Sequence, residues 1–203
     1  MAVLLKDLDP LDTGRDPVTI ARDALAGGAR LLQLRQKRVT TGELYATAAH
    51  LRDLTAAAGA TLVVNDRADI ALAVGADGVH IGQEDLPIDA TRRLVGSARL
   101  IGFSTHSEVQ AEAARGNEAD YLSIGPIFAT TSRVPGDPVI GCERLRAIRH
   151  LVAQPLVAIG GITAATAREV LAAGADAIAV IAAIVRAPDV ERATAELIEL
   201  ADA

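Results

Sequence analysis

The chain has 203 residues and a formal net charge of −6, with 50% hydrophobic but only 2% aromatic residues. This length suits one domain, expected to span residues 1–203, with a core packed from Ala, Val, Leu and Ile. No apolar run reaches the roughly 18 residues that a membrane span needs. The acidic balance lacks the basic bias of nucleic-acid-binding proteins, and Cys142, the single cysteine, excludes an internal disulfide and a multi-cysteine metal site.

The N-terminal segment MAVLLKDLDP lacks the basic flank and the small-residue cleavage site of a signal peptide. We therefore expect a cytoplasmic protein without membrane or nucleic-acid partners. The sequence leaves the oligomeric state open, a homo-oligomer included.

Short apolar segments rich in β-forming residues alternate with Ala-rich segments of helical period. The segments expected to form strands are Val3–Leu5, Leu31–Leu34, Leu62–Val64, Gly78–His80, Leu100–Gly102, Tyr121–Ser123, Leu156–Ile159 and Ala177–Val180.

Three helix starts are recognisable between these strands. Asp16 is a predicted N-cap with Pro17 at the first helical position. Ser107, with Gln110 three residues later, is typical of a capping box. Thr163 is expected to cap a helix over Ala164–Ala173 that ends at Gly174.

One short phrase recurs along the chain, each time between a predicted helix and a predicted strand. Its variants begin Gly28-Ala29-Arg30, Gly75-Ala76-Asp77, Glu118-Ala119-Asp120 and Gly174-Ala175-Asp176. A repeat that spans two strand–helix units, with eight strands in all, predicts a single (βα)8 TIM barrel. An open doubly wound sheet is the alternative, but no Gly-x-Gly-x-x-Gly follows the first strand.

Polar residues follow the predicted strands, and in such a barrel the loops after the strands carry the chemistry. Their convergence on one face indicates an enzyme. These residues include Gln33, Arg35, Lys37, Asn65, Asp66, Arg67, His80, Gln83, Asp85, Ser104, His106 and the loop Gly125–Arg133.

Gly160-Gly161 and the segment after the eighth strand predict a phosphate site, with phosphate-binding loops at the C-terminal strand ends. Glycines let backbone N–H groups approach a ligand closely, and a short helix starting near Ala182 would point its free N–H groups at the same place. The loops after strands seven and eight form the recurrent phosphate site of this fold. A tight turn between packed layers is the alternative.

Asp66 and Asp85 are expected at the ends of adjacent strands, where two carboxylates suit Mg²⁺. Alternatively, Asp66 caps the next helix and Asp85 opens a surface turn. Arg35 and Lys37 share a face if their strand continues, and they suit a phosphate; solvated loop cations are the alternative. The Thr130–Arg133 loop offers hydroxyl groups, amides and a cation.

His80 and His106 are candidate acid–base groups. His80 lies within a predicted strand, where a packed and hydrogen-bonded histidine is the commoner case. His106 precedes a helix N-cap.

Five motifs together resemble the thiamin phosphate synthase family, in order and with family-like spacing from about residue 13 to the C-terminus. They are Gln33-Leu34-Arg35-Gln36-Lys37, Val64-Asn65-Asp66-Arg67, Gly78–Asp85, Gly125-Pro126-Ile127-Phe128 and Ala158–Ile162. The resemblance implies that phosphorylated small molecules are the partners. The implied reaction joins 4-amino-2-methyl-5-(diphosphooxymethyl)pyrimidine to 4-methyl-5-(2-phosphooxyethyl)thiazole and releases pyrophosphate through a pyrimidine carbocation.

The resemblance also implies roles for individual residues. Asp66 and Asp85 would hold Mg²⁺, while Arg35, Lys37 and Asn65 would bind the pyrophosphate and Arg133 the pyrimidine diphosphate. Gln33 and Ser104 would orient the pyrimidine. The thiazole phosphate would be bound by Thr130, Thr131, Ser132, Gly161 and the backbone at Ile181 and Ala182. Of these, Arg35, Lys37, Ser104 and Arg133 would be catalytic.

The chain departs from the family pattern at three points. Arg133 stands where Lys is usual, Ala182 stands where Ser is usual, and the first strand lacks the usual Thr-Asp. Two rival functions stay open: the sister thiazole tautomerases, which need a His where this chain has Pro126, and a barrel that binds phosphorylated ligands without turnover.

Overall fold

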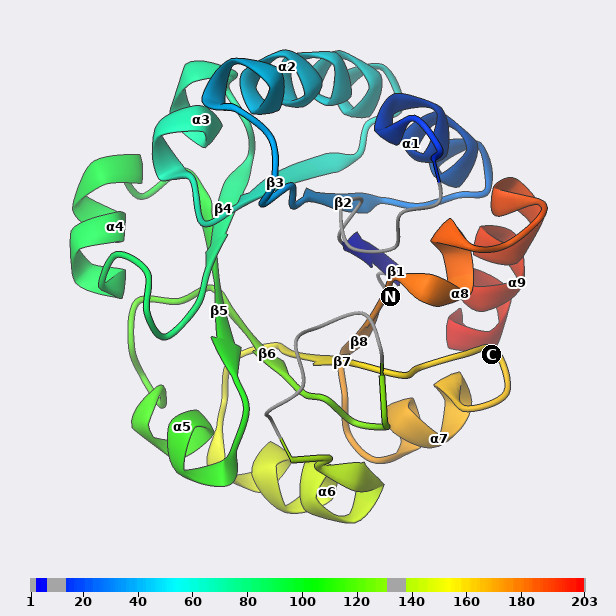
Figure 1. Ribbon diagram of the computed structural model, residues 1–203. Helices are drawn as coiled ribbons and strands as arrows, with labels where there is room; N and C mark the ends of the chain where they lie inside the picture. The colour runs from blue at the N-terminus through cyan, green and yellow to red at the C-terminus, as the bar shows by residue number, and fades with distance from the viewer. Residues whose placement is uncertain (1–2, 7–13, 131–137, 203) are drawn as a thin grey trace.

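The computed structural model describes residues 3–6, 14–130 and 138–202, which form a parallel sheet wrapped by helices. Each strand pairs with its neighbours in sequence, and β1 also pairs with β8, so the sheet closes into a barrel. Figure 1 shows the strands at the centre and the helices in a ring around them. The alternating α/β order and the parallel strands predicted from the sequence are confirmed.

The strands are β1 Val3–Lys6, β2 Leu31–Leu34, β3 Thr61–Asn65, β4 Gly78–Ile81, β5 Leu100–Thr105, β6 Tyr121–Ile124, β7 Leu156–Ile159 and β8 Ala177–Val180. The helices are α1 Pro17–Ala26, α2 Thr41–Ala57, α3 Ala68–Ala73, α4 Ile88–Val95, α5 Glu108–Ala113, α6 Gly141–Leu151, α7 Ala167–Ala172, α8 Ala182–Val185 and α9 Val190–Asp202.

The predicted bounds of the fifth strand are wrong by three residues. The strand was expected to end at Gly102, but β5 continues to Thr105, and Ser104 pairs with Ser123 of β6. Ser104 therefore lies inside the sheet rather than on a loop. A polar residue at this position does not end the strand, because its side chain faces the barrel interior and forms a hydrogen bond with His80 there.

The helix starts are confirmed in part. Asp16 caps α1, because its side chain accepts a hydrogen bond from the Thr19 N–H. The Ser107 side chain accepts from the Gln110 N–H, but the Gln110 side chain accepts from the His106 N–H, so the capping box is incomplete.

The predicted start of the seventh helix is wrong. Helix α7 begins at Ala167 rather than at Ala164, with Thr166 as N-cap. Thr163 instead accepts backbone hydrogen bonds from Thr166 and Ala167 through its carbonyl, which forms a separate turn before the helix.

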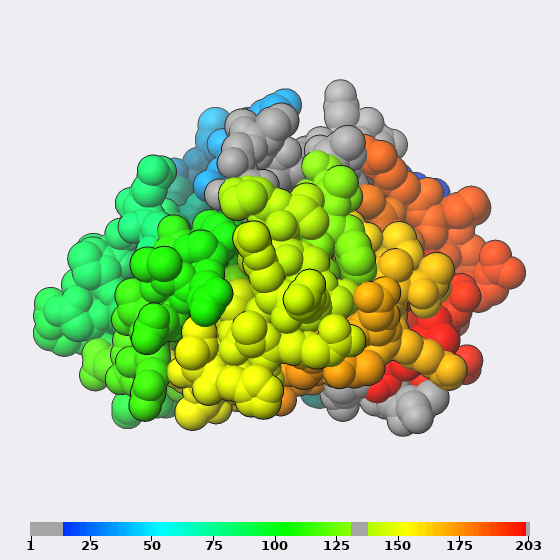
Figure 2. Space-filling model, turned by 90° about the horizontal axis from the view of Figure 1, so that it is seen from below, coloured from blue at the N-terminus to red at the C-terminus, as the bar shows by residue number. Residues whose placement is uncertain are grey.

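The apolar core lies mainly between the sheet and the helices. In β2, Leu32 and Leu34 belong to this core, whereas Gln33 between them has the opposite orientation and faces the barrel interior. A smaller cluster, built around Tyr121, Val157, Ile159 and Ala179, lies among the strands. Figure 2 shows the outer wall on one side, where α6 (yellow) lies between α5 (green) and α7 (orange).

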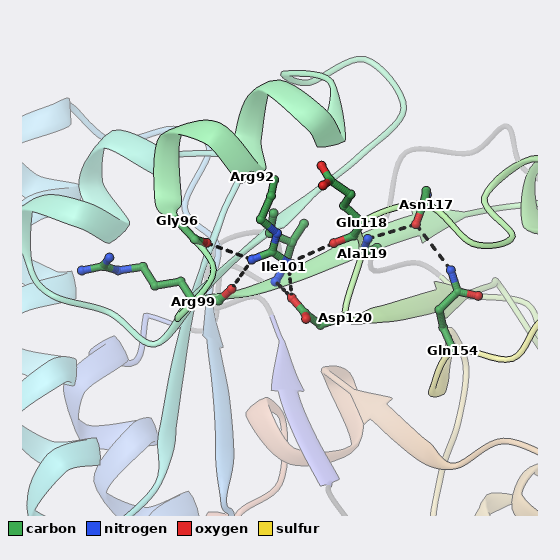
Figure 3. Close-up of polar contacts among 9 residues, drawn as sticks. All are labelled: Arg92, Gly96, Arg99, Ile101, Asn117, Glu118, Ala119, Asp120 and Gln154. Carbon is green, nitrogen blue, oxygen red and sulfur yellow. Dashed lines mark hydrogen bonds and ion pairs between the residues drawn. The ribbon is translucent and has the colours of Figure 1, made fainter.

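The repeated phrase builds a repeated contact, which we name the Arg–Asp clamp. In the clamp shown in Figure 3, one carboxylate oxygen of Asp120 accepts from Arg92 of α4 at 2.6 Å and from the backbone N–H of Ile101 in β5 at 2.7 Å. Arg92 also donates to the carbonyl groups of Gly96, Arg99 and Glu118. Each clamp thus joins a helix, the strand after it and the segment that leads into the next strand.

Two further clamps have the same construction. Arg52 and the Leu62 N–H donate to Asp77, and Arg149 and the Leu156 N–H donate to Asp176. The first copy of the phrase has Arg30 in place of the aspartate, and its side chain donates to the carbonyl of Ala29. Within the described ranges, no helix is long and apolar enough to cross a membrane.

Candidate active site

Two cavities lie at the carboxyl ends of the strands, on opposite parts of the barrel. The first has a volume of about 220 Å³ and lies beyond β2 and β3. The second has a volume of about 400 Å³ and lies beyond β6, β7 and β8. The carboxyl ends of parallel strands are the expected place for a ligand in this architecture.

The first cavity is lined by basic, acidic and amide side chains that the sequence analysis singled out. Its lining includes Arg35, Lys37, Asn65, Asp66 and Arg67. The strand β2 ends at Leu34, so the idea that Arg35 and Lys37 share a face of a continuing strand is wrong. The loop after β2 brings both to the cavity instead.

Asp66 holds an unusual backbone conformation at the end of β3. Its φ angle is +63°. Among the described residues other than glycine, no other has a positive φ angle. Its N–H donates to the carbonyl of His80 at 2.8 Å, and its carboxylate lies 3.1 Å from Lys37 Nζ. Helix α3 begins at Ala68 without a side-chain cap, so the alternative that Asp66 is a helix cap is wrong. Backbone strain of this kind is found most often at functional sites.

Asp85 reaches Asp66 from the loop after β4. Its carboxylate accepts from the Gly82 N–H at 2.7 Å, and its own N–H donates to the Gly82 carbonyl, so Asp85 ends a turn that begins at Gly82 rather than opening one. Burial raises the pKa of Asp85, the Gly82 N–H opposes this, the neighbouring Asp66 carboxylate adds to the rise and Lys37 opposes it. Two acidic groups are therefore in contact beside a cation, although the described residues contain no group of three or more His, Cys, Asp or Glu side chains that could hold a metal.

The second cavity is mostly apolar and is bounded by the consecutive glycines. Gly160 and Gly161 have φ angles of +98° and +67°. A Cβ atom on Gly161 would lie 2.7 Å from the carbonyl oxygen of Ala129 and from Phe128 Cβ. The helix expected near Ala182 is α8, and Ile181 and Ala182 line the same cavity.

Gly161→Ala is expected to weaken binding of whatever ligand occupies this cavity by about tenfold or more, because the new methyl group requires the facing loop to move. Ligand affinity measured by calorimetry checks this, and Gly42→Ala, where a Cβ would meet nothing within 4 Å, is the matched control. Equal affinity in both variants would contradict this role of Gly161.

The loop after β6 is described only in part. Thr130 lines the second cavity, and its role in binding a phosphate stays a prediction. Thr131, Ser132 and Arg133 lie outside the described residues.

A row of polar side chains lies inside the barrel, on the strands β4, β5 and β6. His80 contacts Ser104 Oγ at 2.8 Å through Nε2 and Tyr121 Oη at 3.0 Å through Nδ1. The packed and hydrogen-bonded histidine is therefore the correct alternative for His80. Tyr121 and Ser123 were missed as site candidates, although polar residues at alternate positions of β6 could have indicated that they face inward.

His106 and Gln33 are two further residues that the sequence singled out, and the structure shows what surrounds their side chains. His106 Nδ1 lies 2.9 Å from the carbonyl oxygen of Gly125. Gln33 is 2% exposed, and its amide lies beside the Tyr121 phenol but makes no hydrogen bond of standard geometry with the described residues. A buried amide without such hydrogen bonds is costly, so its presence points to a ligand that supplies them.

Comparison with known proteins identifies relatives over nearly the whole chain. The chain is 49% identical to the thiamine-phosphate synthase of Chloroflexus aurantiacus over 92% of its own length and 86% of that protein. It is 45% identical to the thiamine-phosphate synthase of Methanospirillum hungatei over 94% and 92% of the two chains.

Solved structures agree with these relatives. The thiamine phosphate pyrophosphorylase of Pyrococcus furiosus matches with a TM-score of 0.85 and 44% identity, covering 93% of this chain and 90% of that one. Orotidine 5′-phosphate decarboxylase of Pyrococcus horikoshii, at 19% identity and a TM-score of 0.72, shares the fold alone. The family model described as thiamine monophosphate synthase matches residues 6–184. The chain therefore belongs to the thiamine monophosphate synthase family.

Proposed function

We propose that this protein is a thiamin phosphate synthase, a transferase that joins the pyrimidine diphosphate to the thiazole phosphate and releases pyrophosphate. The observation that carries the proposal is the 49% identity to a synthase over 92% of the chain. The two cavities support the proposal, since one has a charged and polar lining and the other a mostly apolar lining, and both lie at the same end of one barrel.

Asp66 and Asp85 would hold Mg²⁺. Mg²⁺ in proteins is commonly bound by one or two carboxylates, with water and substrate phosphates as the other ligands. The pair meets this requirement, because the two carboxylates contact each other and Lys37 balances only part of their charge. When bound, the ion would neutralise charge on the departing pyrophosphate.

Arg35, Lys37 and Asn65 would bind the diphosphate of the pyrimidine. They line the same cavity as Asp66, and Arg and Lys are the side chains that best match phosphate oxygens. Arg133 would add a further cation from the loop after β6. In a reaction whose leaving group is a polyanion, such fixed positive charges lower the barrier more than a strong base would.

Gln33 and Ser104 would orient the pyrimidine ring. Both are buried in the barrel interior, and the amide of Gln33 can both donate to and accept from an aminopyrimidine. A pyrimidine ring held by these buried side chains would be shielded from bulk water, which would favour capture of the carbocation by the thiazole rather than by solvent.

The thiazole phosphate would occupy the second cavity. Its phosphate would be bound by Thr130, Thr131, Ser132 and Gly161 and by the backbone at Ile181 and Ala182. The apolar lining around Ile159 and Ala179 matches the thiazole ring. On this proposal the loops at the C-terminal strand ends are the phosphate-binding loops of a TIM barrel formed as a single domain over residues 1–203.

Pyrophosphate release tests the proposal against its rivals. We expect release only when both substrates and Mg²⁺ are present, with background rates when any one is omitted. Tautomerisation of a thiazole carboxylate phosphate would instead support the sister activity. Binding of both substrates without any reaction would support a non-catalytic barrel.

A further inference from the structure

The polar row inside the barrel connects the two residues proposed to orient the pyrimidine. Ser104 on β5 contacts His80 on β4, and His80 contacts Tyr121 on β6. Gln33 on β2 lies beside Tyr121. His80, Ser104 and Tyr121 are 1%, 3% and 8% exposed, so the row is closed off from solvent.

Gly102 makes the contact between His80 and Tyr121 possible. Strand pairing places Gly102 of β5 directly between His80 and Tyr121. A Cβ atom at this position would lie 2.3 Å from both His80 Nδ1 and Tyr121 Oη. Any other residue would therefore occupy the space through which the ring and the phenol meet.

The donors and acceptors of the row follow from the Tyr121 phenol, which stays protonated. Burial raises the pKa of Tyr121, so the phenol keeps its proton at neutral pH. His80 Nδ1, 3.0 Å from Tyr121 Oη, is the acceptor to which this proton is directed, since the neighbouring Gln33 side chain approaches the phenol as a donor and lowers its pKa. A neutral imidazole that accepts at Nδ1 carries its proton on Nε2, which then donates to Ser104 Oγ.

Ser104 is left with its own proton to donate. Its oxygen accepts from His80, and Ser123 Oγ, at 3.4 Å, also approaches that oxygen as a donor. Gln83 donates to the Ser104 carbonyl at 2.6 Å, which holds the backbone of this residue in place. The Ser104 hydroxyl is therefore set up as a donor to a ligand atom that accepts, and a pyrimidine ring nitrogen is such an atom.

We propose that Tyr121 and His80 are positioning residues for the pyrimidine substrate, which hold the Ser104 hydroxyl as a hydrogen-bond donor to a ring nitrogen. This inference depends on the proposed function for the identity of the ligand. Neither residue touches the substrate on this account, and both act through Ser104.

Two substitutions of His80 separate positioning from a simple structural role. The side-chain nitrogen of Gln reaches about as far as Nε2, whereas that of Asn reaches only about as far as Nδ1. His80→Gln should therefore keep the donor to Ser104, and His80→Asn should lose it. We expect the Kd and KM for the pyrimidine diphosphate to rise by about fivefold to tenfold in His80→Asn and to change by less than about twofold in His80→Gln.

Tyr121→Phe removes only the phenol oxygen and should raise the same two constants by about fivefold, because His80 is then free to take the other tautomer. The KM for the thiazole phosphate should not change in any of these variants. Thr194→Val is the matched control: it removes a buried hydroxyl, which donates to the Val190 carbonyl in α9, and it should leave every constant unchanged.

The experiment combines calorimetric binding of the pyrimidine diphosphate with steady-state kinetics. If the wild type makes product and the Asn and Gln variants bind the pyrimidine equally, the inference is wrong and the proposed function stands. If the wild type binds the pyrimidine without turnover and only His80→Asn and Tyr121→Phe weaken binding, the inference stands and the synthase proposal falls. If the wild type does not bind the pyrimidine diphosphate, both fall.

Discussion

Asp85→Asn is expected to lower kcat/KM by about 10²–10³-fold without loss of the fold, and Asp66→Asn should have a similar effect. Each substitution keeps the shape of the side chain and removes one negative charge from the acidic pair. Asn still accepts the Gly82 N–H at position 85, and Asn tolerates the positive φ of position 66. Steady-state rates over a range of Mg²⁺ concentrations measure the effect, and the Mg²⁺ concentration for half-maximal rate should rise.

Asp89→Asn is the control for this prediction. Asp89 is an exposed carboxylate in the first turn of α4 that pairs with Arg93 at 2.9 Å, and exposed pairs of this kind contribute little. Its activity and Mg²⁺ dependence should equal those of the wild type. An unchanged Mg²⁺ dependence in both Asp66→Asn and Asp85→Asn would rule out the acidic pair as the metal site.

The second large effect is on stability, at the Arg–Asp clamps. Asp120→Ala is expected to lower the free energy of unfolding by about 2 kcal/mol, because the Ile101 N–H and the Arg92 side chain both lose an acceptor. For a chain of this size that corresponds to a fall in Tm of about 4–8 °C. Urea unfolding and calorimetry measure both quantities.

Asp89→Ala again provides the comparison, since it removes an exposed ion pair at the start of α4, the helix that carries Arg92. It should change the free energy of unfolding by less than about 0.5 kcal/mol. If Asp120→Ala were as stable as Asp89→Ala, the clamp would not be a stabilising feature of the repeat. The kinetic constants of Asp120→Ala should be near those of the wild type at temperatures where it is folded.

Much of the fold can be predicted from the sequence, because the apolar pattern and the repeated phrase act locally. Segments such as Leu31–Leu34 and Ala177–Val180 have the predicted bounds. A glycine of the repeated phrase, Gly28 or Gly174, stands three residues before each of these strands and marks its start. The Asp of the repeated phrase is recognisable as a motif, but its partner Arg lies 25–28 residues earlier on a helix. The clamp itself is therefore a tertiary contact that the motif alone does not reveal.

Two of the errors share a physical cause, which is that polar residues of a buried strand were assigned to the loop after it. Ser104 and Asn65 were both expected on loops, but both lie within strands and face the barrel interior. Such positions are polar because other polar groups surround them, and those groups come from distant strands. The same reason hid Tyr121, whose partner His80 is 41 residues away.

The sequence predicted more of the residues that line the first cavity than of those that line the second. Arg35, Lys37, Asn65 and Asp66 gather as expected, and Asp85 contacts Asp66 as adjacent strands require. The left-handed backbone of Asp66 was not predicted from the sequence, and the partner of its N–H, the His80 carbonyl, comes from the neighbouring strand β4. The roles of Thr131, Ser132 and Arg133 stay predictions.

The most direct measurement of the central proposal is the product formed from the two substrates. Purified protein is incubated with the pyrimidine diphosphate, the thiazole phosphate and Mg²⁺, and the mixture is resolved by chromatography with mass detection. We predict thiamin phosphate and pyrophosphate in equal amounts, with neither formed when Mg²⁺ is chelated. Consumption of neither substrate by folded protein under these conditions would contradict the assignment as a thiamin phosphate synthase.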